Sequence, residues 1–366
     1  MIIFQRMEEF DYEELICFQD RATGLQAIVA IHNTTLGPAL GGCRFWQYTS
    51  ERAGIDDVLR LARGMTYKAS VAGLNLGGGK SVIIGNPKTH KTDDLLRAFG
   101  RFVNTLKGRY IAAEDVGTST DDMVTIRKET RYVVGLPLDH GGSGDPSPVT
   151  AYGVLHGMKA CTKAVFKTNH LSGLTVAIQG AGHVAYNLAK NLAKENARII
   201  ITDIYKKKAQ RAVDDFGAEY VEPDKIYSVK CDIFAPCALG GILDDKNIRR
   251  LKCKIIAGAA NNQLKSDRSC GRLEQMGILY APDYVINAGG LINVADELKG
   301  YNHSRALHKA ARIYNAVARV IRIAKEEKIP TCVAADRLAE RRIERAKLAR
   351  TIHGARRKPV VRQIYT

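Results

Sequence analysis

A lysine at the end of a glycine run is the first residue whose type and setting could support chemistry. Lys80 follows Gly77, Gly78 and Gly79 and precedes the apolar run Ser81 to Ile84, which predicts a buried strand. Glycine allows unusual φ angles and a close approach to a small ligand, so this segment would place one amine at the edge of a cleft. An isolated GGGK segment is otherwise more often a turn beside a surface lysine.

A second lysine and an aspartate could share that cleft. Lys68 lies twelve residues upstream of Lys80, at the end of a helical pattern that begins at Ile55. Two ammonium groups that face one cleft disfavour each other's charge, so one of them could act as a base near neutral pH. Asp115 follows a strand expected over 109–113, at the edge where open α/β sheets bind ligands. Without further context, an aspartate there is more often a helix cap or a turn residue.

Alternating helix and strand patterns surround these candidates. Strand-like runs at 15–18 and 27–31 are followed by helices at 54–70 and 92–107, which alternate with strands at 81–84 and 109–113. Such alternation predicts a layered α/β fold. A chain of 366 residues is longer than one core usually organises, and residues 135–149 contain four glycines and three prolines. We therefore expect one domain over 1–147 and a second over 148–330.

A glycine-rich turn between a strand and a helix predicts dinucleotide binding in the second domain. The apolar segment 174–179 runs directly into Gly180-Ala181-Gly182-His183-Val184-Ala185, a GxGxxA pattern. Gly180 would make the tight turn, Gly182 would let a pyrophosphate approach the helix N-terminus, and Ala185 would let the helix pack closely. A second strand over 198–202 ends at Asp203, which could bind a ribose diol. With further strands at 231–235 and 253–257, a Rossmann-type doubly wound sheet is expected.

The charge and the cysteines of the chain bear on its partners and compartment. The net charge is +17, and residues 337–362 alone contribute +8 through ten Lys/Arg against two Glu. No aromatics interleave with these charges, so we interpret them as a solvated helix face and a basic tail over 351–366, with no nucleic-acid partner. Eight cysteines without a CxxC pair or Cys/His cluster are interpreted as reduced packing residues, with no metal site. No signal peptide or membrane-length apolar run is evident, and a cytoplasmic protein is expected.

Six segments occur in the order GPALGG, RLARGMTYKAS, LNLGGGKSVIIGNP, AAEDVGT, AGAANNQL and APDYVINAGGLINVADEL, within about Phe4 to Arg350. In these segments the chain resembles the glutamate/leucine/phenylalanine/valine dehydrogenase family, and its leucine branch in particular. The resemblance implies NAD-dependent, reversible oxidative deamination of L-leucine and other branched-chain L-amino acids to 2-oxo acids and ammonia. It also implies a cleft between an N-terminal substrate domain and the Rossmann domain, a helix over about 331–350 that returns to the first domain, and a cytoplasmic homo-octamer.

The resemblance also implies a role for each candidate residue. Lys68 would bind the substrate carboxylate, Lys80 would activate the attacking water, and Asp115 would move protons to and from the nitrogen. The other expected substrate contacts are Asn262, the backbone at Gly41, Gly42, Gly77 and Gly78, and the side-chain pocket of Leu40, Ala113, Leu291 and Val294. Around the cofactor, the expected residues beyond the GxGxxA turn and Asp203 are Thr150, Ala238, Ala260 and Asn261.

Some positions depart from the family pattern, and two other functions stay open. His183, Cys43 and Asp145 stand where asparagine, threonine and asparagine are usual. His183, beside the pyrophosphate, could make cofactor affinity depend on pH. Within the enzyme class, the alternative is a phenylalanine-specific or broader relative. Outside it, the alternative is a nucleic-acid-binding regulator that uses the basic tail.

Overall fold

The structure is a computed structural model that describes residues 3–353, and the side chains of Asp267 and of residues 350–353 are left out of the description. The described residues divide into two units. Unit 1 contains residues 3–145, 294–303 and 339–353, and unit 2 contains residues 146–293 and 304–338. The basic tail expected over 351–366 therefore lies mostly outside the described residues, which end at His353.

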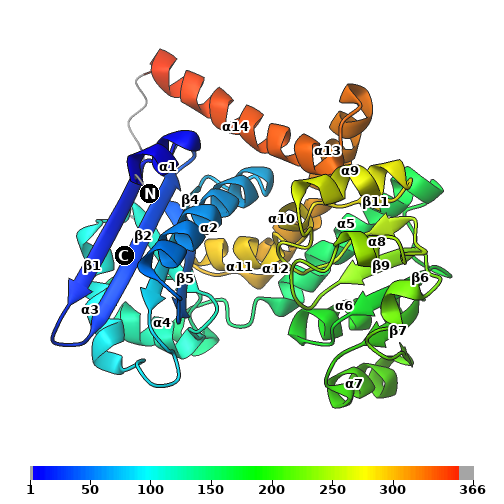
Figure 1. Cartoon of the computed structure of the whole chain (residues 1–366), viewed down its shortest axis with the longest axis horizontal. Helices are drawn as coiled ribbons and strands as arrows, with labels where there is room; N and C mark the ends of the chain where they lie inside the picture. The colour runs from blue at the N-terminus through cyan, green and yellow to red at the C-terminus, as the bar shows by residue number, and fades with distance from the viewer. Residues whose placement is uncertain (1–2, 354–366) are drawn as a thin grey trace. The chain divides into compact units, whose positions relative to one another are not determined.

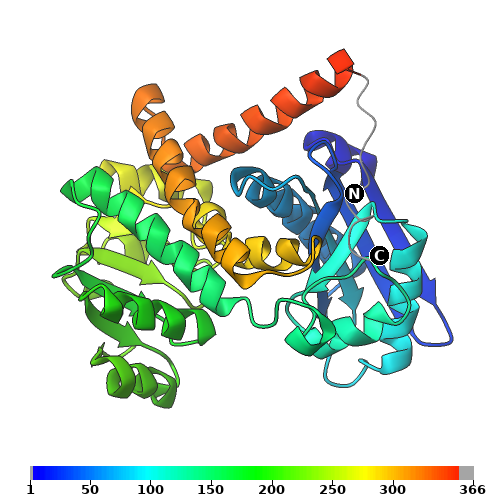
Figure 2. The ribbon, with the colours of Figure 1, turned by 180° about the vertical axis from the view of Figure 1, so that it is seen from behind.

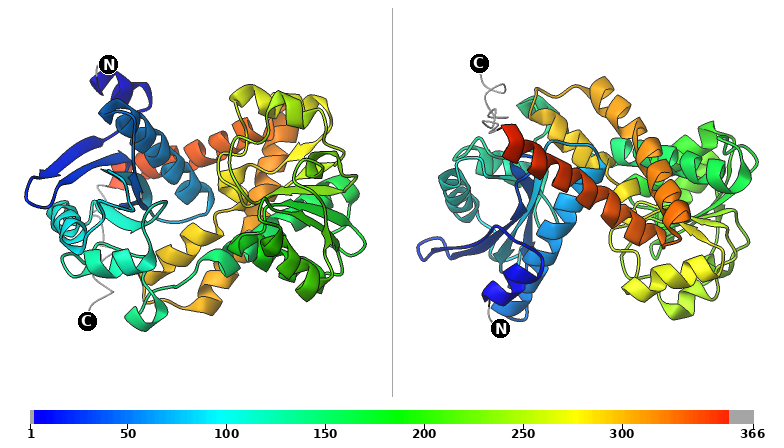
Figure 3. Two further views of the ribbon diagram at one scale, coloured as in Figure 1. Left: turned by 60° about the horizontal axis from the view of Figure 1, so that its bottom comes forward. Right: turned by 90° about the horizontal axis from the view of Figure 1, so that it is seen from above.

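Unit 1 is built on a five-stranded sheet in the order β1-β2-β4-β3-β5. The β1–β2 hairpin, dark blue in Figure 3, forms one edge of the sheet, and β4 pairs antiparallel with β2 and parallel with β3. The helix α2 covers one face, and α3 and α4 cover the other (Figure 1). The bounds are α1 (Ile3–Glu9), β1 (Glu14–Asp20), β2 (Leu25–Asn33), β3 (Ala39–Trp46), α2 (Glu51–Val71), β4 (Gly77–Ile84), α3 (Asp93–Thr105), β5 (Tyr110–Glu114) and α4 (Thr120–Arg127).

Both faces of this sheet have apolar packing, because β2 presents apolar side chains to each face along most of its length. On the α2 face, Ile28, Ala30 and Val82 pack against Val58, Leu59 and Ala62 of the helix. On the other face, a larger cluster that includes Phe45 and Tyr110 packs against α3 and α4. One strand differs from expectation, because β3 was not predicted, and it includes Gly41 and Gly42 of the GPALGG segment.

Unit 2 contains six parallel strands in the order β11-β10-β9-β6-β7-β8. This is the Rossmann order, with the reversal between β6 and β9, and it confirms the predicted fold class. In Figure 2, α5 and α13 lie side by side, where Gly153 leaves room for Ile313. The bounds are α5 (Ser147–Phe166), β6 (Thr175–Gln179), α6 (His183–Lys194), β7 (Arg198–Thr202), α7 (Lys206–Phe216), β8 (Glu219–Tyr220), β9 (Ile233–Pro236), α8 (Asp245–Ile248), β10 (Ile255–Ile256), α9 (Asp267–Gln275), β11 (Leu279–Tyr280), α10 (Asp283–Ile286), α12 (His303–Ala311) and α13 (Ile313–Glu327).

Three of the described helices contain residues of both units: α12 has only its first residue, His303, in unit 1, and the other two are shared more evenly. α11 (Gly289–Glu297) ends in unit 1, where the buried Glu297 carboxylate accepts hydrogen bonds from the main-chain nitrogens of Gly135 and Ser143. α14 (Thr331–His353) begins in unit 2, and its residues from Ala339 onward belong to unit 1. There Arg342 donates hydrogen bonds to the carbonyls of Ser70 and Leu74, at the C-terminal end of α2. None of the described helices is long and apolar enough to span a bilayer.

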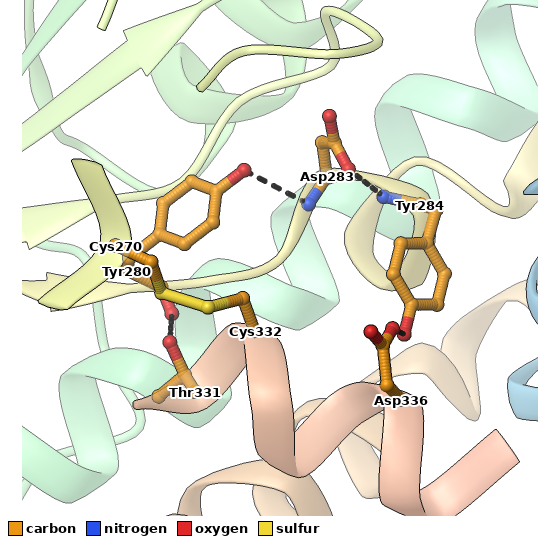
Figure 4. Close-up of a disulfide and its surroundings, with 7 residues drawn as sticks. All are labelled: Cys270, Tyr280, Asp283, Tyr284, Thr331, Cys332 and Asp336. Atoms are coloured by element: carbon orange, nitrogen blue, oxygen red, sulfur yellow. Dashed lines mark hydrogen bonds between the residues drawn. A yellow bond between two sulfur atoms is a disulfide. The ribbon is translucent and has the colours of Figure 1, made fainter. Parts of the chain in front are cut away.

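The interpretation of all cysteines as reduced is wrong for one pair. Cys270 of α9 and Cys332 of α14 form a disulfide within unit 2, shown in Figure 4, and the other six cysteines are free. The same region is joined by hydrogen bonds from Thr331 to the carbonyl of Tyr280 and from the Tyr284 hydroxyl to Asp336. The two cysteines lie 62 residues apart, so no local spacing indicated that they meet.

Candidate functional site

Three parallel strands place the lysine and aspartate candidates on one face of the unit 1 sheet. The registers align Gly42 of β3 with Ala113 of β5, and they pair Cys43 with Ser81, so Gly42 lies beside Lys80 of β4. Paired residues of a parallel sheet point to the same face, and side chains alternate along each strand. Lys80, Gly42 and Ala113 therefore form a row on the face that α2 covers. Because the middle position has no side chain, Lys80 can extend over it.

Lys80, which is buried, and Asp115, which is partly buried, form an ion pair. The Lys80 Nζ donates to Oδ1 of Asp115 at 2.7 Å, and the Lys80 side chain is only 5% exposed. Burial raises the pKa of Asp115, but the charges of Lys80 and Arg44 outweigh it and hold the pKa below its usual range. A carboxylate and an amine at hydrogen-bonding distance can pass a proton between them or to a ligand that contacts both. The pair therefore has the geometry of an acid–base couple.

The glycines around Lys80 allow close packing, and the expectation of unusual φ angles in the 77–79 run is wrong. These glycines belong to β4, and none of them has a positive φ. A Cβ at Gly77 would lie 2.1 Å from the Asn33 carbonyl, and one at Gly78 would lie 2.0 Å from the Thr66 nitrogen of α2. At Gly41, a Cβ would lie 1.7 Å from the carbonyl of Gly79. A side chain at Gly78 would push the sheet and α2 apart, and one at Gly77 or Gly41 would collide with the neighbouring main chain.

The remaining unit 1 candidates lie on β3, α2 and α11. Leu40 precedes Gly42 by two residues on β3, so its buried side chain points to the same face of the sheet. Lys68 is half-buried near the C-terminal end of α2, two residues after the Thr66 that packs on Gly78. Val294, on α11, is 8% exposed. Leu291 is also buried but belongs to unit 2, as does Asn262.

Two charged residues of the same network were missed in the sequence. Arg44, two residues after Gly42, donates from Nε to Oδ2 of Asp115 and from Nη1 to Oδ2 of Asp57, each at 2.8 Å. The Asp57 carboxylate also accepts hydrogen bonds from the Tyr48 hydroxyl and from Arg60. An arginine within an otherwise apolar strand was the available signal, because a buried charge needs partners. The strand itself had not been predicted, so the signal was not used.

In unit 2, the glycine turn lies at the reversal of strand order. Gly180 has a φ of +104°, a conformation that favours glycine, and a Cβ there would lie 2.8 Å from the Cβ of Ala238. The loops after β6 and β9 therefore contact each other at the point where doubly wound sheets bind nucleotides. Gly182, the N-cap of α6, is exposed, and a Cβ there would meet no described atom within 4 Å. A phosphate can thus approach the main chain at this helix N-terminus.

The other predicted cofactor residues surround this turn. Asp203 follows β7, where its Oδ2 accepts from the Ala181 nitrogen at 2.8 Å and its Oδ1 accepts from the Tyr205 nitrogen at 2.9 Å. Carboxylate oxygens have further acceptor sites, so hydroxyls of a ribose could also bind. Ala185 is fully buried, whereas His183 begins α6 and is exposed. The neighbouring Val184 is half-buried.

The loop after β10 carries the candidates Ala260, Asn261 and Asn262, and it is held by Asn287, which was not identified from the sequence. The buried Asn287 donates from Nδ2 to the carbonyl of Ala259 at 3.0 Å and to Oδ1 of Asn261 at 2.8 Å. Ala260 is buried, and Asn262 has a φ of +51° that turns the loop. The hydroxyl of Thr150, in the first turn of α5, donates to the carbonyl of Pro146 at 2.8 Å.

The three departures from the family pattern have different surroundings. Cys43 is fully buried, and burial raises the pKa of its thiol to about 12, so it is a neutral packing residue. Asp145 lies near Glu114, whose pKa is raised by burial and by the charges of Asp145, Asp115 and Glu297. His183, as the first residue of α6, stands beside the expected phosphate site.

A Rossmann-type unit joined to a unit with a lysine–aspartate ion pair defines an α/β dehydrogenase. Residues 13–132 match the Glu/Leu/Phe/Val dehydrogenase dimerisation domain, and residues 141–205 and 201–351 match the Glutamate/Leucine/Phenylalanine/Valine dehydrogenase family model. The chain is 60% identical to leucine dehydrogenase of Thermoactinomyces intermedius and 59% identical to that of Bacillus subtilis (strain 168), each over 351 residues and 96% of both chains. The crystal structure of L-tryptophan dehydrogenase from Nostoc punctiforme is similar, with a TM-score of 0.85, 46% identity, and coverage of 94% of this chain and 100% of that one. The chain belongs to the Glu/Leu/Phe/Val dehydrogenase family.

Proposed function

We propose that this chain catalyses the NAD-dependent, reversible oxidative deamination of L-leucine and other branched-chain L-amino acids to 2-oxo acids and ammonia. The observation that carries the proposal is the ion pair of Lys80 and Asp115, 2.7 Å apart, on a sheet face that also bears Leu40 and Ala113. An acid–base couple beside an apolar wall fits a substrate with one reacting amine and an aliphatic side chain. The 60% identity to a leucine dehydrogenase supports the same substrate class.

Three side chains of the chain are proposed to have different roles in the reaction. Lys68 binds the substrate carboxylate, because a fixed cation orients that end of the molecule. Lys80 takes a proton from the water that attacks the imino carbon, and Asp115 carries protons to and from the nitrogen. When bound, NAD accepts the hydride from the substrate Cα.

The side-chain pocket is proposed to select aliphatic substrates. Leu40 offers no cation to a second carboxylate, and Ala113 and Val294 are also apolar. A glutamate side chain would be desolvated there without a partner, at a cost of several kcal/mol. Leu291 completes the proposed wall and disfavours an aromatic ring by its bulk. Discrimination among leucine, isoleucine and valine should be modest, because one methylene is worth about 1–3 kcal/mol.

NAD is proposed over NADP because of the acid after β7. Asp203 would bind the ribose hydroxyls and repel a 2′-phosphate, and its neighbour Ile204 offers no positive charge. The open main chain at Gly182 supports the site of the pyrophosphate. The remaining residues proposed to contact the cofactor are Ala181, Val184, His183, Thr150, Ala238, Ala260 and Asn261. The remaining contacts proposed for the substrate are the Asn262 side chain and the backbone at Gly41, Gly42, Gly77 and Gly78.

The proposal is tested by measuring reduction of NAD and of NADP, separately, with twenty amino acids at alkaline pH. We expect the highest kcat/KM for leucine, isoleucine or valine with NAD, and a turnover at least about 100-fold lower in the Lys80→Ala variant. Phenylalanine or glutamate equal to leucine would overturn the pocket, and comparable kcat/KM with NADP would overturn the role of Asp203. A protein that is inactive with every amino acid would refute the proposed function.

Assembly and location are part of the same proposal. We infer a cytoplasmic homo-octamer, because the chain resembles the leucine branch along nearly its whole length. Light scattering of the purified protein measures the mass directly, and a smaller assembly would contradict the octamer. No nucleic-acid partner is proposed for the basic tail, and a salt-sensitive gel shift lost on truncation of the tail would contradict this.

A further inference from the structure

Arg44 bridges two carboxylates on different elements, and the roles proposed above do not use it. Its Nε donates to Asp115, and its Nη1 donates to Asp57 of α2. We propose that Arg44 is a positioning residue for the reaction: it orients the Asp115 carboxylate toward Lys80 and remains its counter-charge when Lys80 loses a proton. This inference rests on the proposed function, because it takes Lys80 as the base and Asp115 as the proton carrier.

The two oxygens of Asp115 have separate donors. Oδ1 accepts from Lys80 at 2.7 Å, and Oδ2 accepts from Arg44 at 2.8 Å. A carboxylate is planar, so a donor on each oxygen fixes its rotation. The main chain is held as well, because the Asp115 nitrogen donates to the Thr118 hydroxyl at 2.9 Å. Arg44 thus fixes the carboxylate plane by a contact that does not depend on the protonation of Lys80.

Arg44 is itself held by neighbours that do not touch Lys80. Asp57 accepts from Arg44 and from the Tyr48 hydroxyl on Oδ2, each at 2.8 Å, and from Arg60 on Oδ1 at 2.7 Å. The guanidinium presents its donors in a rigid planar fork, so two carboxylates fix its position and its tilt. The Arg44 side chain is 21% exposed, whereas that of Arg60 is 55% exposed. Arg60 donates to the Asp57 oxygen that Arg44 does not use, so removing Arg60 leaves both Arg44 contacts in place.

The charges explain why a permanent cation is needed beside Asp115. Lys80 must lose a proton to act as a base, whereas a guanidinium keeps its charge in proteins. If Lys80 were the only cation near this partly buried carboxylate, its deprotonation would leave a charge without a partner, which is costly. With Arg44 in place, the Asp115 carboxylate keeps a counter-charge and its orientation when Lys80 is neutral.

A purely structural role for Arg44 makes a different prediction. In that case the ion pairs with Asp57 and Asp115 would only join β3 to α2 and to the end of β5. Removing Arg44 would then lower stability and leave the kinetics of the folded enzyme unchanged. The two roles are separated by turnover and by its pH dependence, which a structural contact does not set.

The test compares Arg44→Met, Arg44→Lys and Arg60→Met with the wild-type enzyme in leucine oxidation, after circular dichroism has shown that each is folded. We expect Arg44→Met to lower kcat about 100-fold with little change in the KM for NAD. The acid limb of its kcat/KM profile should move to higher pH, because loss of a fixed positive charge favours the protonated state of every nearby group. Arg44→Lys keeps the charge without the fork, so it should restore the acid limb and only part of kcat. Arg60→Met should match the wild type.

Each result decides the proposal. An unshifted acid limb with kcat within about threefold of the wild type in Arg44→Met would overturn it, and so would equal losses in Arg60→Met. If Arg44→Met does not fold, Arg44→Lys carries the test, and unchanged kcat in that variant would overturn the orienting role. A wild type inactive with every amino acid would instead refute the proposed function. The inference is then judged by a crystal structure of Arg44→Met or Arg44→Lys, in which an unmoved Asp115 carboxylate would overturn it.

Discussion

The backbone of Gly42 packs directly against the side chain of Asp115. A Cβ added at Gly42 would lie 2.7 Å from the Asp115 Cβ and 3.1 Å from the Lys80 Nζ. Carbon atoms in contact prefer about 3.5–4.0 Å, so the added atom could not be accommodated without displacing one or both side chains. The hydrogen bond between Lys80 and Asp115 therefore depends on the absence of a side chain at position 42.

Gly42→Ala should consequently separate Lys80 from Asp115. We expect kcat for leucine to fall about 100-fold, because a displacement of about 1 Å in a catalytic group has that effect. Gly64→Ala is the matched control, since a Cβ at Gly64 meets nothing within 4 Å in the exposed part of α2 and should stabilise the helix by up to about 1 kcal/mol. If the alanine raised only KM, the added methyl would be meeting substrate, and the proposed displacement of the pair would be wrong.

Lys68→Ala should affect substrate binding more than chemistry. The Lys68 ammonium is proposed to hold the substrate carboxylate in the ground state and the transition state alike, so its loss should raise the KM for leucine and change kcat less.

Lys80→Ala should show the opposite pattern, with turnover reduced by about 10²- to 10⁴-fold and NAD still bound. Steady-state kinetics with leucine and fluorescence titration with NAD give both quantities. A normal KM in Lys68→Ala would argue against its carboxylate contact.

Helices and strands that a local sequence pattern indicates could be predicted. Strands whose residues fit only because of neighbours distant in the sequence could not. The strand, glycine turn and helix between Thr175 and Lys194 follow one another along the chain, so spacing alone indicated their order. β3 has Gly41 and Gly42 at its centre, which are typical of turns. They are accepted in a strand because β4 and β5 leave no room for side chains on either side. Only the tertiary structure contains that information.

The candidate site shows the same division. Lys68, Lys80 and Asp115 could be selected by residue type and by resemblance, but the row that joins Lys80 to Ala113 across Gly42 depends on strand register. Arg44 was missed because a charged residue in a strand has meaning only when the strand is known. The disulfide required α14 to begin beside α9, and no motif of the sequence encodes that contact.

The disulfide should stabilise unit 2 measurably. Closing a loop of this length reduces the entropy of the unfolded chain by an amount worth about 4 kcal/mol. Cys332→Ser, and the wild type under a thiol reductant, should therefore unfold at a similar, lower temperature, whereas Cys17→Ser, at an exposed cysteine, should not. The denatured wild type should titrate six thiols before reduction and eight after it. Eight thiols before reduction would contradict the disulfide.

His32, a buried residue at the end of β2, should make the stability of the fold depend on pH. Its Nε2 lies 3.0 Å from the Phe10 carbonyl and must donate to it, so Nδ1 accepts from the Thr66 hydroxyl at 2.8 Å. Burial lowers its pKa to about 4, the Phe10 hydrogen bond opposes this, and the nearby Arg63 charge adds to it. The imidazole is therefore neutral in the folded protein at neutral pH.

The sign of the effect follows from where the proton binds. Above pH 6.5 the ring is neutral in both the folded and the unfolded protein, and His32 does not reduce the free energy of unfolding. As the pH falls toward 4, the unfolded chain binds a proton that the folded protein excludes, so the free energy of unfolding decreases, by about 3 kcal/mol in all. His32→Gln keeps a donor and an acceptor but cannot titrate. Urea unfolding at pH 7 and near pH 4, at one protein concentration, should show a larger loss for the wild type than for this variant, and equal losses would show that His32 does not exclude the proton.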